Sequence, residues 1–310
     1  MRTGSAMSAA ARSVRGVVME AAQEIAAYEE LARDPAERTR RSTRMIRDYY
    51  AFCTDIYRAT WGESHHFPVF HGGESRAEAM AAGERDLADR GGFTAGMKVL
   101  EIGSGVGGPA VTIAAHSGAH VTGLDLVEHR VEHARAHAAA RCLSHLTDFR
   151  VGDAADMPFQ DASFDAVYSI EAICHMPDKT RVHAEAARVL KPGGLYLGSD
   201  WLQATGLTTE QQERFVEPVC RGFALPGLST PDALRRDLLA AGFVVEDLRD
   251  VGADGALEPN WRELEDVMAA IPPADKTPLL DLMERAGTSL CTAARNGTFL
   301  IGCWFARKPS

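Results

Sequence analysis

Between residues 97 and 200, short apolar runs alternate with segments of helical periodicity. The apolar runs have the length of strands and read "KVLEIG", "HVTGLD", "FRVGDA", "FDAVYSI" and "GGLYLGSD". Segments such as "VEHRVEHARAHAAA" and "KTRVHAEAARVL" lie between them and are rich in helix formers. Strands that alternate with helices are typical of a parallel sheet with both faces covered. The pattern therefore predicts an α/β fold.

The segments on either side of this alternation have different patterns. Residues 8–32 are rich in Ala and Glu and place apolar residues at helical spacing, which predicts an amphipathic helix. Lys and Arg do not dominate its polar face, so a lid or an oligomer arm is favoured over a membrane anchor. After Asp200 a mixed segment precedes the helix "TPDALRRDLLAAG", the strand "FVVEDLRDV" and the strand-like end "FLIGCWFARK".

Composition narrows the class of protein. The 310 residues are 45% apolar and 25% charged, as in an ordinary globular protein. The net charge of −10 argues against nucleic acid as the main partner, because phosphate contacts need Lys and Arg. Six cysteines without a C-x-x-C pair favour free thiols in a reducing compartment. With no signal peptide and no apolar run of bilayer length, we expect a soluble, cytoplasmic protein.

Arginines are concentrated in the stretch "RDPAERTRRSTRMIRDYY". One interpretation is a solvated helix face that balances an acidic protein. The other is an anion-receiving patch for a charged substrate tail such as a diphosphate. The arginines concerned are Arg33, Arg38, Arg40, Arg41, Arg44 and Arg47.

A glycine-rich loop follows the first predicted strand in "VLEIGSGVGGPA". Gly103 and Gly105 permit a tight turn and the close approach of a ligand to the backbone, and Gly107 lets the next helix start near the sheet. Asp125 ends the second predicted strand, where a carboxylate can accept hydrogen bonds from both hydroxyls of a ribose. Because Gly103, Gly105 and Gly108 also fit G-x-G-x-x-G, a dinucleotide site competes with other nucleosides.

Two features favour a cationic ligand over a dinucleotide. Glu101 precedes the first glycine by two residues and would attract a sulfonium ligand that carries an amino group, but would repel a pyrophosphate. The stretch "GDAADMPF" offers Asp153 and the backbone of Ala154 to an adenine edge. The sequence thus points to a sulfonium nucleoside.

In their order and spacing, several motifs resemble those of class I S-adenosylmethionine-dependent methyltransferases. They are "VLEIGSGVGG", "VTGLD", "GDAADMPF", "SFDAVYSIEAICHMPD" and "RVLKPGGLYL". Within that superfamily, "YYAFCTDIY", "WGESHHF" and "IEAICH" are similar to the sterol methyltransferase group and its bacterial relatives that act on isoprenoids and other natural products. The resemblance implies a Rossmann-like seven-stranded sheet with an antiparallel last strand, an N-terminal helical lid and a helical cap insertion.

The resemblance also implies four parts and a set of ligand-binding residues. The parts are an N-terminal arm or lid (1–48), an S-adenosylmethionine-binding core (49–201), a cap or substrate segment (202–240) and a C-terminal completion of the sheet (241–310). The expected cofactor-binding residues are Tyr50, Glu101, Gly103, Ser104, Gly105, Gly107, Asp125, Leu126, Asp153, Ala154 and Ile170. Two positions depart from the sterol enzymes, which often carry Asn in place of Asp125 and an aromatic residue in place of His65.

Candidate catalytic residues gather after the fourth predicted strand, where ligands of such sheets bind. They are Glu171 and His175, with Tyr50 and His66 from the N-terminal segment. If the acceptor is an isoprenoid-type alkene carbon, Glu171 stabilises the carbocation or removes its proton, and aromatic side chains shelter it, such as those of Tyr49, Tyr50, Trp61, Phe67 and Trp201. If the acceptor is a hydroxyl or amine, His175 oriented by Asp200 is the general base. The first interpretation is favoured over the second.

Other function classes stay open at this stage. A nicotinamide-dependent oxidoreductase could use the same sheet, and a non-catalytic binding protein would leave Glu171 and His175 dispensable. His129, His133 and His137 fall on one helix face, but a solvated face explains them better than a metal site. We expect no protein-bound metal, and Mg²⁺ only if the substrate is a diphosphate. The expected partner is a small molecule, with homo-oligomerisation through the N-terminal helix as a further option.

Overall fold

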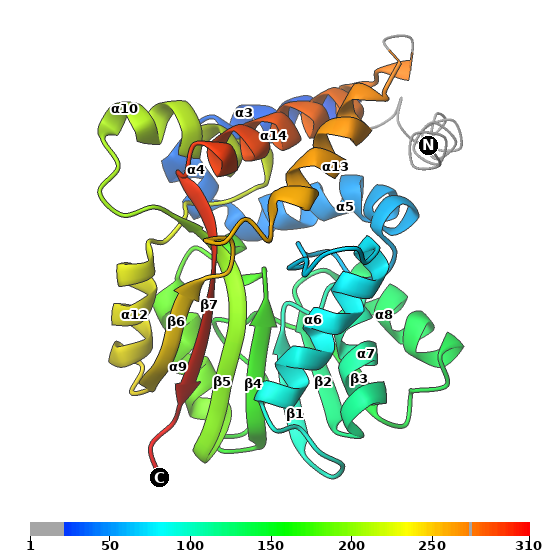
Figure 1. Cartoon of the computed structure of the whole chain (residues 1–310), viewed down its shortest axis with the longest axis vertical. Coiled ribbons are helices and arrows are strands. Elements are labelled where there is room, and N and C mark those ends of the chain that lie inside the picture. Colours follow the sequence, from blue (N-terminus) through cyan, green and yellow to red (C-terminus); the bar gives the residue numbers. More distant parts are fainter. Residues whose placement is uncertain (1–21, 273–274) are drawn as a thin grey trace.

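A seven-stranded sheet forms the centre of the computed structural model, which describes residues 22–272 and 275–310 (Figure 1). The strands lie in the order β3-β2-β1-β4-β5-β7-β6, and β7 runs antiparallel to both of its neighbours. Their bounds are β1 Lys98–Ile102, β2 His120–Asp125, β3 Thr147–Val151, β4 Phe164–Ile170, β5 Leu190–Gln203, β6 Val244–Asp250 and β7 Phe299–Arg307. The predicted sheet and its antiparallel last strand are confirmed.

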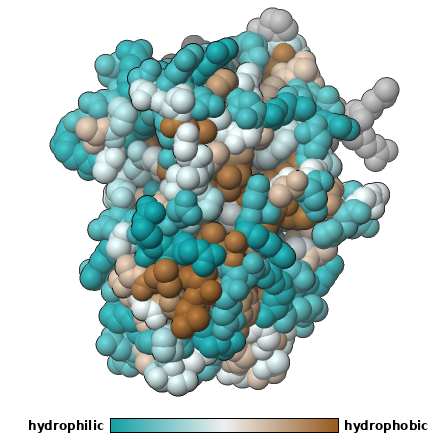
Figure 2. Space-filling model, turned by 60° about the vertical axis from the view of Figure 1, so that its left-hand side comes forward, coloured by the Kyte–Doolittle hydropathy of each residue, from teal (hydrophilic) through white to brown (hydrophobic). Residues whose placement is uncertain are grey.

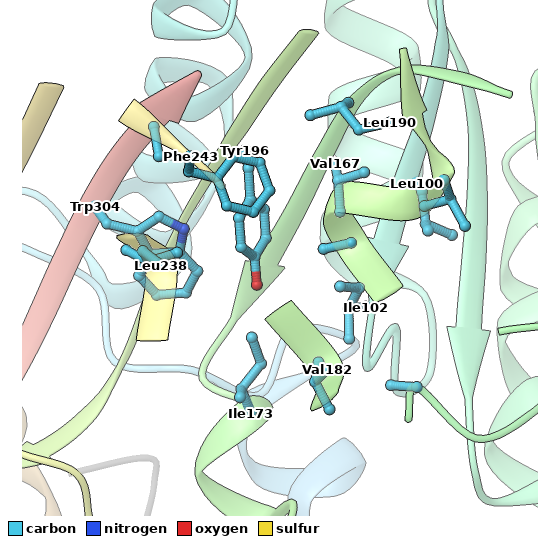
Figure 3. Close-up of a cluster of buried hydrophobic side chains, with 14 of the residues drawn as sticks. Leu100, Ile102, Val167, Ile173, Val182, Leu190, Tyr196, Leu238, Phe243 and Trp304 are labelled. Carbon is cyan, nitrogen blue, oxygen red and sulfur yellow. The ribbon is translucent and has the colours of Figure 1, made fainter. Parts of the chain in front are cut away.

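Helices cover both faces of the sheet, and each face has its own core. One face packs against α6 Arg76–Arg90, α7 Gly108–Ser117 and α8 Glu128–Ala140, and the other against α9 Lys179–Val189 and α12 Pro231–Ala240. Neighbouring strand residues such as Val99 and Leu100 belong to different cores, because side chains alternate across a strand. In the second core, the ring of Tyr196 packs 5.1 Å from Phe243 and 5.5 Å from Trp304 (Figure 3).

A helical layer covers the carboxyl edge of the parallel strands (Figure 1). It combines N-terminal, middle and C-terminal parts of the chain, which meet in two further apolar clusters. Its elements are α3 Ala22–Ala32, α4 Pro35–Arg40, α5 Ser42–Trp61, α10 Thr209–Gln211, η2 Gln212–Val216, α11 Glu217–Gly222, α13 Glu258–Ala269 and α14 Pro278–Arg295. This layer closes the edge at which α/β proteins bind ligands.

The layer draws on more of the chain than the expected lid and cap. Within 202–240, η2 and α11 join it, whereas α12 packs beside the sheet against α9 and β6. From 241–310, both α13 and α14 join it. Of the expected helix 8–32, the part before Ala22 lies outside the described residues. The bounds of the four expected parts stay a prediction.

The outer surface is mostly hydrophilic, with few large apolar side chains exposed. Leu239 at the end of α12 and Val244 at the start of β6 are 53% and 54% exposed. Figure 2, turned toward the side that carries these elements, shows an apolar patch within a hydrophilic surface. Within 22–272 and 275–310, no helix is both long enough and apolar enough to span a bilayer.

Ion pairs within the arm engage most of the arginine cluster. Arg40 and Arg41 pair with Glu37, and Arg44 pairs with Asp48. These contacts favour the interpretation that the cluster balances nearby acids over that of a patch reserved for a substrate anion.

Arg38 is the exception, because it is a buried tie between the arm and the rest of the layer. Its side chain is 1% exposed and makes two hydrogen bonds of 2.7 Å to the carboxylate of Glu217 on α11. It also donates to the carbonyl oxygens of Leu225, at 2.9 Å, and Ala32, at 2.6 Å. One guanidinium thus joins α3, α4 and α11.

Arg38→Ala should lower the free energy of unfolding by about 3–5 kcal/mol, because it leaves a partly buried carboxylate and two carbonyl groups unpaired. Chemical denaturation followed by circular dichroism measures the change. The matched control is Arg40→Ala, which removes an exposed pair with Glu37 and should have little effect. Equal effects of the two substitutions would show that Arg38 does not hold the layer together.

Candidate active site

Two adjoining cavities lie beneath the helical layer at the carboxyl edge of the sheet. The loop cavity, of about 1040 Å³, is bounded by the glycine-rich loop, the ends of β2 and β4, and α5. The aromatic cavity, of about 720 Å³, is bounded by α5, α11, α13 and α14. Both volumes include space that is open to solvent.

The loop cavity gathers nearly all of the expected cofactor-binding residues. Its lining includes Tyr50, Glu101, Gly103, Ser104, Gly105, Asp125, Leu126, Asp153, Ala154 and Ile170. Gly107 is not in the lining. A Cβ atom on Gly107 would lie 2.9 Å from the Ala134 Cβ, so this glycine serves the packing of α7 against α8. That the expected residues bind a cofactor stays a prediction.

The glycine-rich loop is shaped by backbone conformations that L side chains rarely adopt. Gly103 has φ +75° and Gly105 has φ +55°. A Cβ atom on Gly103 would lie 2.2 Å from the Ala172 Cβ, and one on Gly105 would lie 2.5 Å from a guanidinium nitrogen of Arg130. Gly103 is therefore required by conformation and by space, and Gly105 by conformation.

Asp125 holds the loop in place through its own carboxylate. Its oxygens accept hydrogen bonds from the backbone N–H of Gly105, at 2.8 Å, and of Val127, at 2.9 Å. Arg130 lies 3.9 Å from this carboxylate and stacks 3.8 Å from the ring centroid of Tyr50. Each carboxylate oxygen keeps a second lone pair, so the group can still accept from ribose hydroxyls. Arg130 thereby connects the loop to α5.

Glu101 supplies a buried carboxyl group to the loop cavity. It is 1% exposed, and its Oε2 has no hydrogen-bond partner among the described residues. Burial first, and then the nearby charge of Glu84, raise the pKa of Glu101 well above its usual range. An ammonium group placed here would donate a charge-assisted hydrogen bond to the ionised Glu101, whereas a pyrophosphate would gain no cationic partner from this carboxyl group. The residues therefore fit S-adenosylmethionine.

Glu171 stands on the wall between the two cavities. Its backbone has φ +49°, which is uncommon for a residue other than glycine and turns the chain sharply after β4. One carboxylate oxygen accepts from the Phe67 N–H at 2.9 Å and the other from the Trp201 indole N–H at 2.6 Å. Burial raises the pKa of Glu171 to about 7. The carboxylate is thus rigidly held and poised between its two protonation states.

His175 is held by Tyr50 and not by Asp200. Its Nε2 lies 3.0 Å from the Tyr50 hydroxyl, and burial followed by the charge of Arg130 lowers its pKa to about 3. The Asp200 carboxylate accepts a hydrogen bond from the backbone N–H of Trp201. Together with Lys179, it lines a separate small cavity. Neighbouring residues of β5 point to opposite faces, so Trp201 reaches the aromatic cavity and Asp200 does not. The expected orientation of His175 by Asp200 is wrong.

His66 serves the loop cavity from a fixed position. Its Nε2 lies 3.2 Å from Glu84 on α6, and Ser64 donates to the same carboxylate oxygen. It lines the loop cavity but not the aromatic cavity. His65, the preceding residue, lines both.

The aromatic cavity collects side chains from distant parts of the chain. All the aromatic residues expected to shelter a cation line it, namely Tyr49, Tyr50, Trp61, Phe67 and Trp201. The sequence did not single out the other lining residues, which include Tyr57, Phe223, Leu264, Leu282, Met283 and Leu290. Helical spacing identifies their helices, but only the packing of α11, α13 and α14 brings them to one space. Tyr50, His65, Glu171 and His175 line both cavities and form their shared wall.

The histidines of α8 pack partly against α5. The Nε2 of His129 lies 3.3 Å from the backbone oxygen of Tyr50, and the Nδ1 of His133 lies 3.1 Å from a guanidinium nitrogen of Arg58. The expected solvated face is confirmed only in part, because α5 partly covers this side of α8 and the histidines are half-buried. Over the described ranges, no cluster of three or more His, Cys, Asp and Glu side chains has the arrangement of a metal site.

Comparisons with known proteins bear on this chain from sequence and from structure. Residues 100–198 match the family model described as "Methyltransferase domain". A 24-methylenesterol C-methyltransferase 2 of Oryza sativa subsp. japonica is 40% identical over 219 residues, covering 70% of this chain and 60% of the relative. A sterol 24-C-methyltransferase of Gibberella zeae, ERG6B, is 40% identical over 229 residues, covering 73% and 60%. The chain thus spans about 60% of the length of these curated relatives.

Solved structures share the fold at low sequence identity. The [4+2]-cyclase SpnF has a TM-score of 0.72 and 24% identity, with 86% of this chain and 96% of that chain covered. A geranyl diphosphate C-methyltransferase from Streptomyces coelicolor A3(2), solved with Mg²⁺, geranyl diphosphate and S-adenosyl-L-homocysteine, has a TM-score of 0.68 and 17% identity, with 86% and 97% covered. These likenesses confirm the expected fold.

The unpaired carboxyl of Glu101 leads to a prediction about ligand binding. Burial raises its pKa and a bound ammonium group should lower that pKa again, so S-adenosylhomocysteine should bind with release of protons. Calorimetry in two buffers of different ionisation enthalpy measures that release. Glu101→Gln should abolish the release and weaken binding by about 10- to 100-fold.

The control for this experiment is Glu246→Gln, which changes a surface carboxylate that pairs with Arg307 and lines neither cavity. It should leave both affinity and proton release unchanged. Proton release that persists in Glu101→Gln would mean that another group titrates on binding.

Proposed function

We propose that this chain methylates a carbon atom of an uncharged isoprenoid-type alkene. The proposal starts from the core of the chain, which is that of a class I S-adenosylmethionine-dependent methyltransferase and resembles the sterol methyltransferases. The observation that carries this proposal is the carboxylate of Glu171 on the wall between the loop cavity and the aromatic cavity. A methyl donor in the first cavity and an alkene in the second would meet beside this group.

The loop cavity would hold the cofactor, which supplies an electrophilic methyl group on a cationic sulfur. Glu101 would receive its ammonium group, Asp125 its ribose hydroxyls, and Asp153 with Ala154 its adenine edge. Tyr50, tied to His175 and Arg130, would close the arm over the carboxylate end. Fixing donor and acceptor in line can by itself lower the barrier by roughly 7 to 11 kcal/mol.

The aromatic cavity suits a cation that forms on a hydrocarbon. Methylation of an alkene carbon leaves a positive charge on the adjacent carbon. The faces of nearby aromatic rings can each stabilise such a charge by about 0.5 to 2 kcal/mol. Trp201 stacks on Phe67 with ring centroids 5.8 Å apart, and the indole of Trp201 also holds Glu171. The ionised Glu171 would then stabilise the cation through a short, desolvated interaction.

The lining of the aromatic cavity favours an acceptor without a diphosphate. Among the described residues, no Lys or Arg lines it, and burial lowers the pKa of both His65 and His175 to about 3, so that neither carries a charge. The ion pairs within the arm engage Arg40, Arg41 and Arg44. A diphosphate would meet Glu171 in place of cationic partners. We therefore propose catalysis without Mg²⁺.

Transfer to oxygen or nitrogen is less well supported. That reaction would need a general base oriented by a partner, and His175 contacts the Tyr50 hydroxyl instead of Asp200. A nicotinamide-dependent activity would place a pyrophosphate against Glu101, a carboxyl group that offers it no cationic partner. Cytoplasmic localisation, a role in secondary metabolism and an oligomer formed through the N-terminal helix stay predictions, and part of that helix lies outside the described residues.

The proposal is tested with purified protein, S-adenosylmethionine labelled in its methyl group, and three acceptors. We expect label in the organic extract with a sterol that has a side-chain double bond or with farnesol, and none with farnesyl diphosphate in the presence of Mg²⁺. Mass spectrometry should place the new methyl group on carbon. Label found only on farnesyl diphosphate, or only on oxygen, would overturn the proposal.

Glu171→Gln should lower turnover by roughly 10²- to 10³-fold, because the neutral amide cannot stabilise a cation as a carboxylate does. Since the pKa of Glu171 is raised to about 7, the stabilising carboxylate is lost as the pH falls below 7. In the wild type, kcat/KM should therefore rise as the pH increases through about 7, and in Glu171→Gln that rise should be absent. Affinity for S-adenosylhomocysteine, measured by calorimetry, should be unchanged. A loss of cofactor affinity would instead indicate a structural role.

A further inference from the structure

His65 carries a hydrogen-bond acceptor that no described residue uses. Its Nε2 lies 2.9 Å from the backbone oxygen of Gly62. A carbonyl oxygen can only accept, so Nε2 bears the proton and Nδ1 is the bare nitrogen. Nδ1 is buried and has no hydrogen-bond partner among residues 22–272 and 275–310. The ring lies on the shared wall of the two cavities.

Packing alone does not require a histidine at this position. The ring makes an edge contact with Tyr57 at 5.5 Å between centroids, which a phenyl ring would make equally well. A buried acceptor without a partner destabilises the folded protein. The hydrogen bond to Gly62 accounts for Nε2, and a ligand accounts for the unpartnered Nδ1. Burial and the charge of Arg130 lower the pKa of His65 to about 3, so the ring stays neutral at working pH.

The proposed reaction needs a group that accepts a proton from the methylated cation. Each oxygen of the Glu171 carboxylate accepts one hydrogen bond and keeps one lone pair, so the group stabilises the cation while partly engaged by the protein. On the same wall, the Nδ1 atoms of His65 and His175 both lack a partner among the described residues. Only that of His65 is fixed as a lone pair, because its Nε2 donates to a carbonyl oxygen, whereas the Nε2 of His175 lies on a hydroxyl that can donate or accept. We propose that His65 is a catalytic residue, the base that takes this proton; the proposal rests on the alkene methylation proposed above.

The step balances without a further reactant. A C–H bond next to the cationic carbon breaks, its electron pair forms a new carbon–carbon double bond, and the proton moves to Nδ1 of His65. The imidazolium that forms lies on the wall that also carries Glu171. A carbocation is so strong an acid that a weakly basic imidazole is sufficient. The neutral state of His65 keeps the lone pair free in every turnover.

Two ammonium ions that mimic the cation test this role without knowledge of the natural acceptor. N,N-dimethyldodecylamine is protonated at neutral pH and presents one N–H, whereas N,N,N-trimethyldodecylammonium carries the same charge and no N–H. Each is titrated into protein saturated with S-adenosylhomocysteine. Trp61 and Trp201 line the aromatic cavity, so their fluorescence reports binding.

The wild type should bind the tertiary amine about 10- to 100-fold more tightly than the quaternary ion, because only the former donates to Nδ1. His65→Phe should bind both equally while keeping its affinity for S-adenosylhomocysteine. Glu171→Gln should weaken both probes to the same extent, since it removes only charge. His116→Phe, a surface change at the partner of Asp89, should behave as the wild type.

Other outcomes overturn the proposal in distinguishable ways. A preference for the tertiary amine that survives in His65→Phe would assign the proton to another group. Weaker binding of S-adenosylhomocysteine by His65→Phe would make His65 a cofactor contact. Equal binding of both probes by the wild type would reject the base and leave the methyltransferase proposal intact. Binding of neither probe would count against both.

Discussion

The site depends on keeping one carboxylate out of water. A buried carboxyl group is costly unless donors compensate it, and Glu171 receives a backbone N–H from Phe67 and an indole N–H from Trp201. These two donors come from the segment after α5 and from β5, so the carboxylate is in place only when that segment is docked on the sheet. Its raised pKa records how little solvent remains around it. The helical layer, the aromatic lining and the strained backbone after β4 all serve this one position.

The layer that excludes water is held by polar ties as well as by apolar packing. Arg38 joins α4 to α11, and Tyr50 joins α5 to the glycine-rich loop through His175 and Arg130. Buried charged groups of this kind contribute more to a defined arrangement than to net stability. These contacts hold the helical layer over the site in one position.

The sequence predicted those parts of the molecule that depend on local pattern. Alternation of strands and helices gave the sheet, and the loop glycines and Asp125 gave the edge at which a nucleoside binds, because strand ends and tight turns are encoded within a few residues. It did not predict contacts made across the chain. Whether Asp200 or Tyr50 reaches His175 depends on which face of β5 a residue occupies and on how α5 docks. In the sequence Gly107 resembles the other glycines of the loop, but in the structure its missing side chain leaves room for the close packing of α8. The far wall of the aromatic cavity arises only when α13 and α14 meet α11.

The four residues of the shared wall make each cavity part of the boundary of the other. A ligand in the loop cavity completes the surface against which a second ligand packs, and the second ligand covers the exit of the first. Their binding free energies are therefore coupled, and thermodynamic linkage makes the coupling equal in both directions. A tightly bound ligand in the aromatic cavity would slow the release of the demethylated nucleoside from the loop cavity. The shared wall would then determine the order in which the two products leave.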